Sequence, residues 1–181
     1  MVKAHLIHIL DEQISVGFTG KVNVLDPFTK QMLGSVYMFE GDLIHTKYKS
    51  ILGIKAFFNL CIDEFENVEL NYVVEPELID LNSRSIHYPY SVLKRKIAEV
   101  VENFRASKEN RPPEHIKILI RPEFIGLGED VTGAEFDLLN TISDYNRVGD
   151  IYKYCSLLDY EITNCLVSLR KKNALTVVKN K

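Results

Sequence analysis

The chain has 181 residues, of which 46% are hydrophobic and 26% are charged, and its formal net charge is −3. This balance is ordinary for a folded globular protein and excludes fibrous and largely disordered classes. No apolar run approaches the ~20 residues that a bilayer-spanning helix needs. The first residues, in which His5, His8 and Asp11 interrupt the apolar stretch, are not typical of a secretory signal. We therefore expect a cytoplasmic protein with no membrane insertion.

The charge is distributed unevenly along the chain. Residues 1–82 hold 6 basic and 12 acidic side chains, whereas residues 83–181 hold 16 basic and 13 acidic ones. An acidic front half is a poor binder of nucleic acid, because that affinity depends on neutralising phosphates. The asymmetry indicates two functional units and allows an electrostatic match within the chain or with another molecule.

The front half of the chain has the pattern of a small sheet with helical cover. In chain order, the predicted elements are the helix His5–Val16, the strands Val22–Asp26, Met32–Phe39 and Leu43–Tyr48, the helix Gly53–Cys61 and the strand Val68–Val74. The second strand is nearly all apolar near its end, so we expect it in the centre of the sheet. Gly41 can supply the positive φ that a tight hairpin loop requires.

After a connection over residues 75–90, the periodicity changes to a mainly helical one. Apolar residues predict a helix of about four turns, then a short strand, three short helices and a final strand. These elements are the helix striped by Leu93, Ile97, Val100, Val101 and Phe104, the strand Ile116–Ile120, helices around 136–142, 148–155 and 159–172, and the strand Leu175–Val178. Asp159 is a plausible N-cap of the last helix and Asn173 a left-handed cap at its end.

These elements predict an α+β protein. We expect a small antiparallel sheet with helices over residues 1–82 and a helical connector over 83–132. Residues 133–181, with three short helices and a strand, have the outline of a winged helix-turn-helix.

Residues 5–80 resemble the bacterial PATAN domain, also called DUF4388. The residues that carry the resemblance follow the leading helix and are Thr19–Val22, Phe39–His45 and Gly53–Phe58. They match the family's G-x-L strand, its x-G-x-[IL]-x-x-A turn and its G-x-x-A helix. The sequence departs from this pattern at Val22, where Leu is usual, and at Thr46, where Ala is usual.

Residues 133–179 resemble the winged-helix segments that often follow a PATAN domain. The resemblance lies in the Glu135 helix start, the helix from Val148 to Ile151 and the Leu169 to Leu175 segment. Together the two resemblances imply a bacterial signalling or regulatory protein that acts through protein contacts. Some relatives are linked to response-regulator pathways that control polarity, pili or surface motility.

No residue pattern indicates catalysis or a cofactor. The three cysteines have wide spacings that fit neither a zinc ribbon nor a thioredoxin-type pair, and phosphate-binding and nucleophile-elbow motifs are missing. His5, His8 and Glu12 share a helix face at a spacing that metal sites use. Because no second cluster supplies a further ligand, we interpret them as a solvated face. We assign no catalytic, cofactor-binding or metal-binding residue.

Two kinds of partner remain open, protein and DNA. A winged helix can place its third helix in the major groove, and Thr163, Asn164, Ser168 and Lys171 are expected on the exposed face of that helix. Residues 133–181, however, hold 7 basic and 6 acidic side chains, a weak footprint for phosphate contact. We therefore favour a protein partner. The candidate interaction surface comprises Tyr88, Tyr90, Arg95, Asn164, Ser168 and Lys171, and the sequence indicates no oligomeric state.

Overall fold

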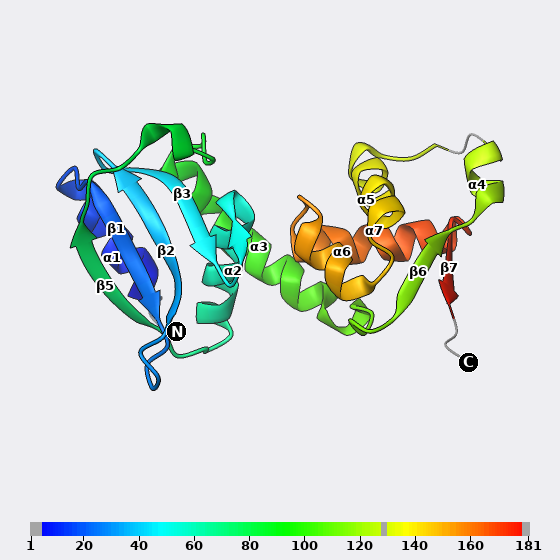
Figure 1. Cartoon of the computed structure of the whole chain (residues 1–181), viewed down its shortest axis with the longest axis horizontal. Helices are drawn as coiled ribbons and strands as arrows, with labels where there is room; N and C mark the ends of the chain where they lie inside the picture. The colour runs from blue at the N-terminus through cyan, green and yellow to red at the C-terminus, as the bar shows by residue number, and fades with distance from the viewer. Residues whose placement is uncertain (1–4, 128–129, 179–181) are drawn as a thin grey trace. The chain divides into compact units, whose positions relative to one another are not determined.

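The computed structural model describes residues 5–127 and 130–178. Its contacts divide the chain into two compact units, Met1–Glu102 (unit 1) and Asn103–Lys181 (unit 2), which are drawn in Figure 1. The expected division instead has boundaries after residues 82 and 132. Each unit is described by itself below.

The segment expected to begin a separate connector belongs to unit 1. Leu93 and Ile97 are buried, and so is Ile86. The backbone N–H groups of Ser85 and Ile86 both donate to the Ile44 carbonyl, each at 3.0 Å. The apolar stripe of the long helix and the connection before it therefore complete the core of unit 1.

Unit 1 is built on a five-stranded antiparallel sheet with the strand order β4-β3-β2-β1-β5 (Figure 1). Its elements are α1 (His5–Ser15), β1 (Gly20–Leu25), β2 (Met32–Phe39), β3 (Asp42–Tyr48), β4 (Ile51–Leu52), α2 (Gly53–Phe65), β5 (Asn71–Pro76), the 3-10 turn Leu81–Ser83, and α3 (Tyr90–Ser107), which continues into unit 2. The central position expected for β2 is confirmed. The β2–β3 loop uses positive φ at Glu40 (48°) and Gly41 (82°), as a tight two-residue hairpin requires.

The end of α2 differs from the prediction. The helix continues to Phe65, past the expected Cys61, and the next strand begins at Asn71 rather than at Val68. Asn67 adopts a positive φ of 64°, and the Val68 N–H donates to the Asp63 carbonyl at 2.9 Å. Val68, which the prediction placed in the strand, therefore closes the end of the helix instead.

The core of unit 1 lies where α1 and α2 meet the sheet. Leu6 and Leu10 of α1 are fully buried, as are Val22 and Val36 of the sheet, and α2 packs on β3. Glu64 of α2 joins these parts, because its carboxylate accepts from the Leu6 N–H (2.9 Å) and the Tyr72 hydroxyl (3.1 Å).

The alternate residues of the strands form a polar ladder on the other face of the sheet. The Ser35 hydroxyl donates to Asn23 Oδ1 (2.8 Å), and Asn23 Nδ2 donates to Glu75 Oε2 (2.7 Å). Lys21 lies 2.9 Å from Glu77 and 3.6 Å from Glu75, which is on the edge strand β5. Hydrogen bonds and ion pairs thus connect β2, β1 and β5 on this face.

Unit 2 combines helices with a two-stranded antiparallel ribbon of β6 and β7 (Figure 1). Its elements are the 3-10 turn Lys108–Asn110, β6 (Lys117–Ile120), α4 (Pro122–Leu127), α5 (Gly133–Asp144), α6 (Val148–Tyr154), α7 (Asp159–Lys171) and β7 (Leu175–Val178). Its core joins Ile118 and Leu175 of the ribbon to helical residues such as Leu138, Ile162 and Leu169.

The two caps expected for α7 have different outcomes. Asp159 is the first helical residue rather than the N-cap, which is Leu158. The Leu158 N–H donates to Glu161 Oε2 at 2.8 Å, so the carboxylate of the first turn caps the helix from inside. Asn173 has a φ of 61°, which confirms the left-handed residue expected at the end of α7.

The structure confirms the α+β class, with a small antiparallel sheet in unit 1 and a ribbon among the helices of unit 2. Over the described ranges, none of the helices combines the length and apolar character needed to cross a lipid bilayer.

The Thr46 hydroxyl is buried and has no hydrogen-bond partner among the described residues. An unpaired buried hydroxyl costs about 1–3 kcal/mol. We predict that Thr46→Val, which replaces the hydroxyl by a methyl group of similar shape, raises the free energy of unfolding by about 1 kcal/mol in urea denaturation. Ser35→Ala removes a hydroxyl that does have a partner and is expected to destabilise the protein. Equal stability of Thr46→Val and the unmodified chain would contradict this account.

Candidate functional site

The structure separates the three candidate residues around α3. Tyr88 is 58% exposed and Arg95 is also exposed, with its Nε 3.3 Å from the Ser91 carbonyl. Tyr90 is buried, at 8% exposure. Burial raises the pKa of the Tyr90 phenol, and the nearby Asp11 carboxylate raises it further. Tyr88 and Arg95 can therefore contact a partner, whereas Tyr90 is an internal packing residue.

The candidate residues on α7 also differ in accessibility. Asn164 and Lys171 are exposed, whereas Ser168 is half-buried and its hydroxyl donates to Glu135 Oε1 at 2.7 Å. The expectation that Thr163 is exposed is wrong. Its hydroxyl is buried, lies 2.7 Å from the Tyr152 hydroxyl and donates to the Asp159 carbonyl at 2.9 Å. Thr163 therefore fastens α7 to α6.

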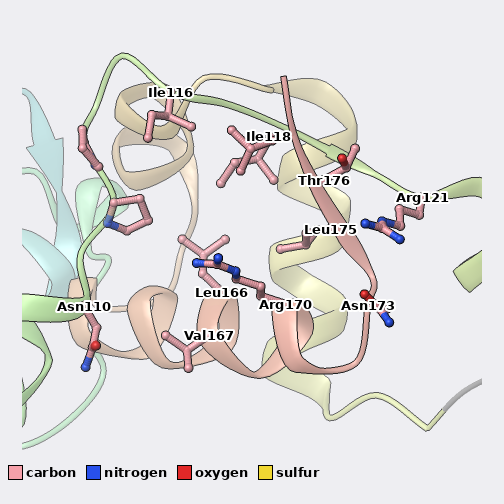
Figure 2. A pocket seen from close by; sticks show the side chains of 13 residues that line it. Asn110, Ile116, Ile118, Arg121, Leu166, Val167, Arg170, Asn173, Leu175 and Thr176 are labelled. Atoms are coloured by element: carbon pink, nitrogen blue, oxygen red, sulfur yellow. The ribbon is translucent and has the colours of Figure 1, made fainter. Parts of the chain in front are cut away.

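A pocket with a volume of about 500 Å³ lies between α7, the β6–β7 ribbon and the segment that precedes β6 (Figure 2). Its lining is mainly aliphatic and includes Pro112, Ile116, Leu166, Val167, Leu175 and Val177. Leu175 belongs to the core and is only 9% exposed, whereas Val177 is 54% exposed. The pocket is therefore the place where the core between ribbon and α7 opens to solvent.

Polar residues join the aliphatic lining of the pocket on the side where α7 ends and β7 begins. The Arg121 N–H donates to the Ala174 carbonyl at 2.9 Å, which places Arg121 beside the start of β7. Arg170 and Asn173 line the pocket from the last turn of α7 and from its cap (Figure 2). Ile116 immediately precedes β6 and therefore lies toward the opposite end, near Val177. Figure 2 shows that the Arg170 side chain extends toward Leu166, whereas Arg121 lies on the other side of β7. A ligand that fills the pocket therefore meets aliphatic groups and the Arg170 guanidinium, with Arg121 beside the start of β7.

No described residue neutralises the two guanidinium groups of the pocket. Within residues 5–127 and 130–178, neither Arg121 nor Arg170 has an ion-pair partner. Arg111 provides the contrast, because its Nη1 lies 2.9 Å from Asp159 Oδ2 and its guanidinium lies 4.2 Å from the centre of the Tyr152 ring. A planar guanidinium matches carboxylate or phosphate geometry. The free arginines therefore favour an anionic ligand.

A buried carboxylate fixes the helix that carries Arg170. Glu135 is 2% exposed and accepts hydrogen bonds from Lys172 Nζ (2.8 Å), Ser168 Oγ (2.7 Å) and the Thr132 N–H (2.7 Å). Burial alone raises the pKa of a carboxyl group. Here the bonds from Lys172, Thr132 and Ser168 outweigh burial and lower the pKa of Glu135 to about 2. The network thus ties the end of α7 to the start of α5.

Folding lowers the pKa of Glu135 from its ordinary value of 4.5. The network of Glu135 therefore stabilises the folded protein fully at pH values above 4.5, and this contribution is lost as the pH falls toward 2. We predict that Glu135→Gln lowers the free energy of unfolding at neutral pH by on the order of 2 kcal/mol. The variant is also expected to show a flatter loss of stability with acid, measured by urea denaturation across this pH window. Asp137→Asn changes an exposed carboxylate of the same helix and is the control. Identical acid profiles for the two variants would refute the assignment.

The thiols of Cys61, in unit 1, and Cys165, in unit 2, lie outside the pocket lining. Burial raises the pKa of Cys61 and raises that of Cys165 to about 11, so both thiols are neutral near pH 7. In the described part of the chain, no three His, Cys, Asp or Glu side chains form a metal-binding group. His8 lies 3.6 Å from Glu12 on an exposed face, and the side chain of His5 lies outside the described residues.

Comparisons of the chain with protein-family models, curated proteins and solved structures found no match. The resemblance to PATAN and winged-helix segments therefore stays a prediction.

Sequence reasoning did not find the pocket. Its two walls come from residues 110–121 and 166–177, which are far apart in the chain, and no motif connects them. Arg170 lies in the last turn of α7, where a cation interacts favourably with the helix dipole. Its position therefore did not indicate a binding site. A signal was present in β7, where the alternation predicts that Leu175 and Val177 share one face, but only the structure shows that Val177 lacks cover.

Proposed function

We propose that this protein is a non-catalytic regulatory adaptor that binds other proteins, and that the unit 2 pocket is one of its recognition sites. The observation that carries the proposal is an aliphatic lining next to Arg121 and Arg170, which lack ion-pair partners among the described residues. A mostly apolar cavity with a few convergent polar groups is typical of a binding site. Arginine is also enriched among residues that dominate the energetics of protein interfaces.

The cellular setting in this proposal comes from the resemblances. A PATAN-like pattern over residues 5–80 and a winged-helix-like pattern over 133–179 support a cytoplasmic protein of bacterial signal transduction, in the control of polarity, pili or surface motility. Unit 1 docks one partner and unit 2 docks another. Exposed Tyr88 and Arg95 supply the kinds of side chain that anchor protein contacts.

DNA binding is the second candidate, because α7 exposes Asn164 and Lys171, which are able to contact bases or phosphates. Two acidic residues, Asp159 and Glu161, lie in its first turn, at the end that usually enters the groove. Residues 103–181 hold 12 basic and 11 acidic side chains. This near balance provides little of the counterion release on which duplex affinity depends, so we favour a protein partner.

The proposal predicts that protein capture depends on the pocket arginines. With the full chain as bait in lysate of its source cells, the double variant Arg121→Glu, Arg170→Glu is expected to reduce recovery of a specific partner about tenfold, the effect of losing charge-assisted contacts worth about 1.4 kcal/mol. The double variant Arg147→Glu, Lys153→Glu makes the same charge change at two exposed positions of unit 2 outside the pocket lining and is expected to retain the partner. Quantitative mass spectrometry measures the recovery.

Two results would count against this function. Equal recovery of all proteins by the bait and by the double variant would remove the pocket as a recognition site. Duplex DNA binding that weakens steeply with salt and is lost in Lys171→Glu would favour the alternative, because that residue lies on the exposed face of α7.

A further inference from the structure

The ribbon beside the pocket has an open edge. β7 pairs with β6, with Ile118 opposite Val177 and Ile120 opposite Leu175, and across the described residues it has no second strand partner. The other side of β6 is occupied, because the Ile118 N–H donates to the Asn146 carbonyl at 2.7 Å. The free edge of this two-stranded sheet therefore belongs to β7.

The hydrogen-bond pattern identifies which backbone groups face that free edge. In an antiparallel pair, residues that exchange hydrogen bonds alternate with residues that do not. The Arg121 N–H donates to the Ala174 carbonyl, and the Ile118 N–H points away from β7 to Asn146. Thr176 and Val178 therefore bond to β6, while the N–H and C=O groups of Leu175 and Val177 point outward. The side chains of these same two residues line the pocket.

We propose that the pocket receives an extended segment of a partner protein, which adds to β7 as the next antiparallel strand. This inference rests on the proposed function and specifies its ligand. Residues of the segment that lie opposite Leu175 and Val177 have their side chains on the pocket face, because directly opposed residues share one face of a sheet. Strand addition to an exposed edge, with alternate side chains in pockets, is an established mode of peptide recognition.

The two ends of the pocket determine the side chains that fit. The residue opposite Val177 lies at the aliphatic end, beside Ile116, and is therefore aliphatic. The residue opposite Leu175 lies toward the last turn of α7, where Arg170 lines the pocket and has no ion-pair partner among the described residues, and is therefore Asp or Glu. The segment thus carries an aliphatic and an acidic residue two positions apart. A nucleic-acid backbone offers phosphates but no aliphatic group for the other end.

A synthetic peptide provides the test. The probe is a fluorescent dodecapeptide of three Ser-Val-Ser-Glu repeats, in which Val and Glu share one face of an extended strand. The control has three Val-Glu-Ser-Ser repeats, with the same composition and charge but with Val and Glu always on opposite faces. Fluorescence anisotropy with the full chain is expected to show at least tenfold weaker binding of the control.

Variants and backbone changes then locate the peptide. Arg170→Glu is expected to weaken probe binding about tenfold, the effect of one lost charge-assisted contact, whereas Lys153→Glu, at an exposed position of α6 outside the lining, leaves it unchanged. Circular dichroism checks that both variants fold. N-methylation of the probe's Val and Glu amides, which face β7 in the added strand, is expected to abolish binding. N-methylation of its Ser amides is expected to be tolerated.

Several results would overturn the inference. Equal binding of probe and control, or equal effects of the two N-methylation patterns, would exclude strand addition. Self-association of the chain that the probe does not reverse would mean that a second copy occupies the edge. If the probe fails to bind while capture of a partner still depends on Arg121 and Arg170, this inference is wrong and the adaptor function stands. If probe binding and that capture both fail, both are wrong.

Discussion

The pocket of unit 2 depends on the antiparallel pairing of β6 with β7, two short strands at opposite ends of the helical segment. This pairing turns Ile118 and Leu175 into the core and carries Val177 beyond it. The left-handed residue Asn173 makes the sharp reversal from α7 into β7 possible, and the Ala174 N–H completes it by donating to the Leu169 carbonyl at 2.9 Å. Backbone geometry, rather than the side chains at the rim, therefore sets the position of both walls.

The polar groups of unit 2 fall into two sets with different physical roles. Glu135 is buried with three hydrogen-bond donors around it, and Arg111 is paired with Asp159. Such groups hold the helices in place, since a buried charge is tolerated only when it is paired. Arg121 and Arg170 are exposed and unpaired within the described residues. An anion can bind them without first breaking an internal ion pair, so the site is prepared for its ligand before that ligand arrives.

Sequence periodicity predicted most of the strands and helices, because the alternation in β1 and the apolar stripe of α7 each record one buried face. It was less able to place ends, as the extension of α2 into the apolar residues after Cys61 illustrates. It also misjudged Tyr90 and Thr163, whose polar atoms suggested surface positions although their rings or methyl groups are internal. The pocket itself was beyond its reach. The sequence around Arg121 and around Val177 has no distinctive motif. The two residues line one pocket only because β6 and β7, which are far apart in the chain, pair with each other.

The edge strands β5 and β7 differ in the features that discourage pairing with other chains. The edge strand β5 carries Glu75, ends in Pro76, and is flanked by the Lys21 to Glu77 ion pair, all devices that discourage unwanted pairing with other chains. The four residues of β7, Leu175-Thr176-Val177-Val178, contain neither a charge nor a proline. Its short length is the only one of these protective devices that β7 has, because its uncharged and mainly aliphatic edge is otherwise open to pairing. Occupancy of that edge consequently has a protective value for the solubility of the chain, separate from any signal that the bound molecule conveys.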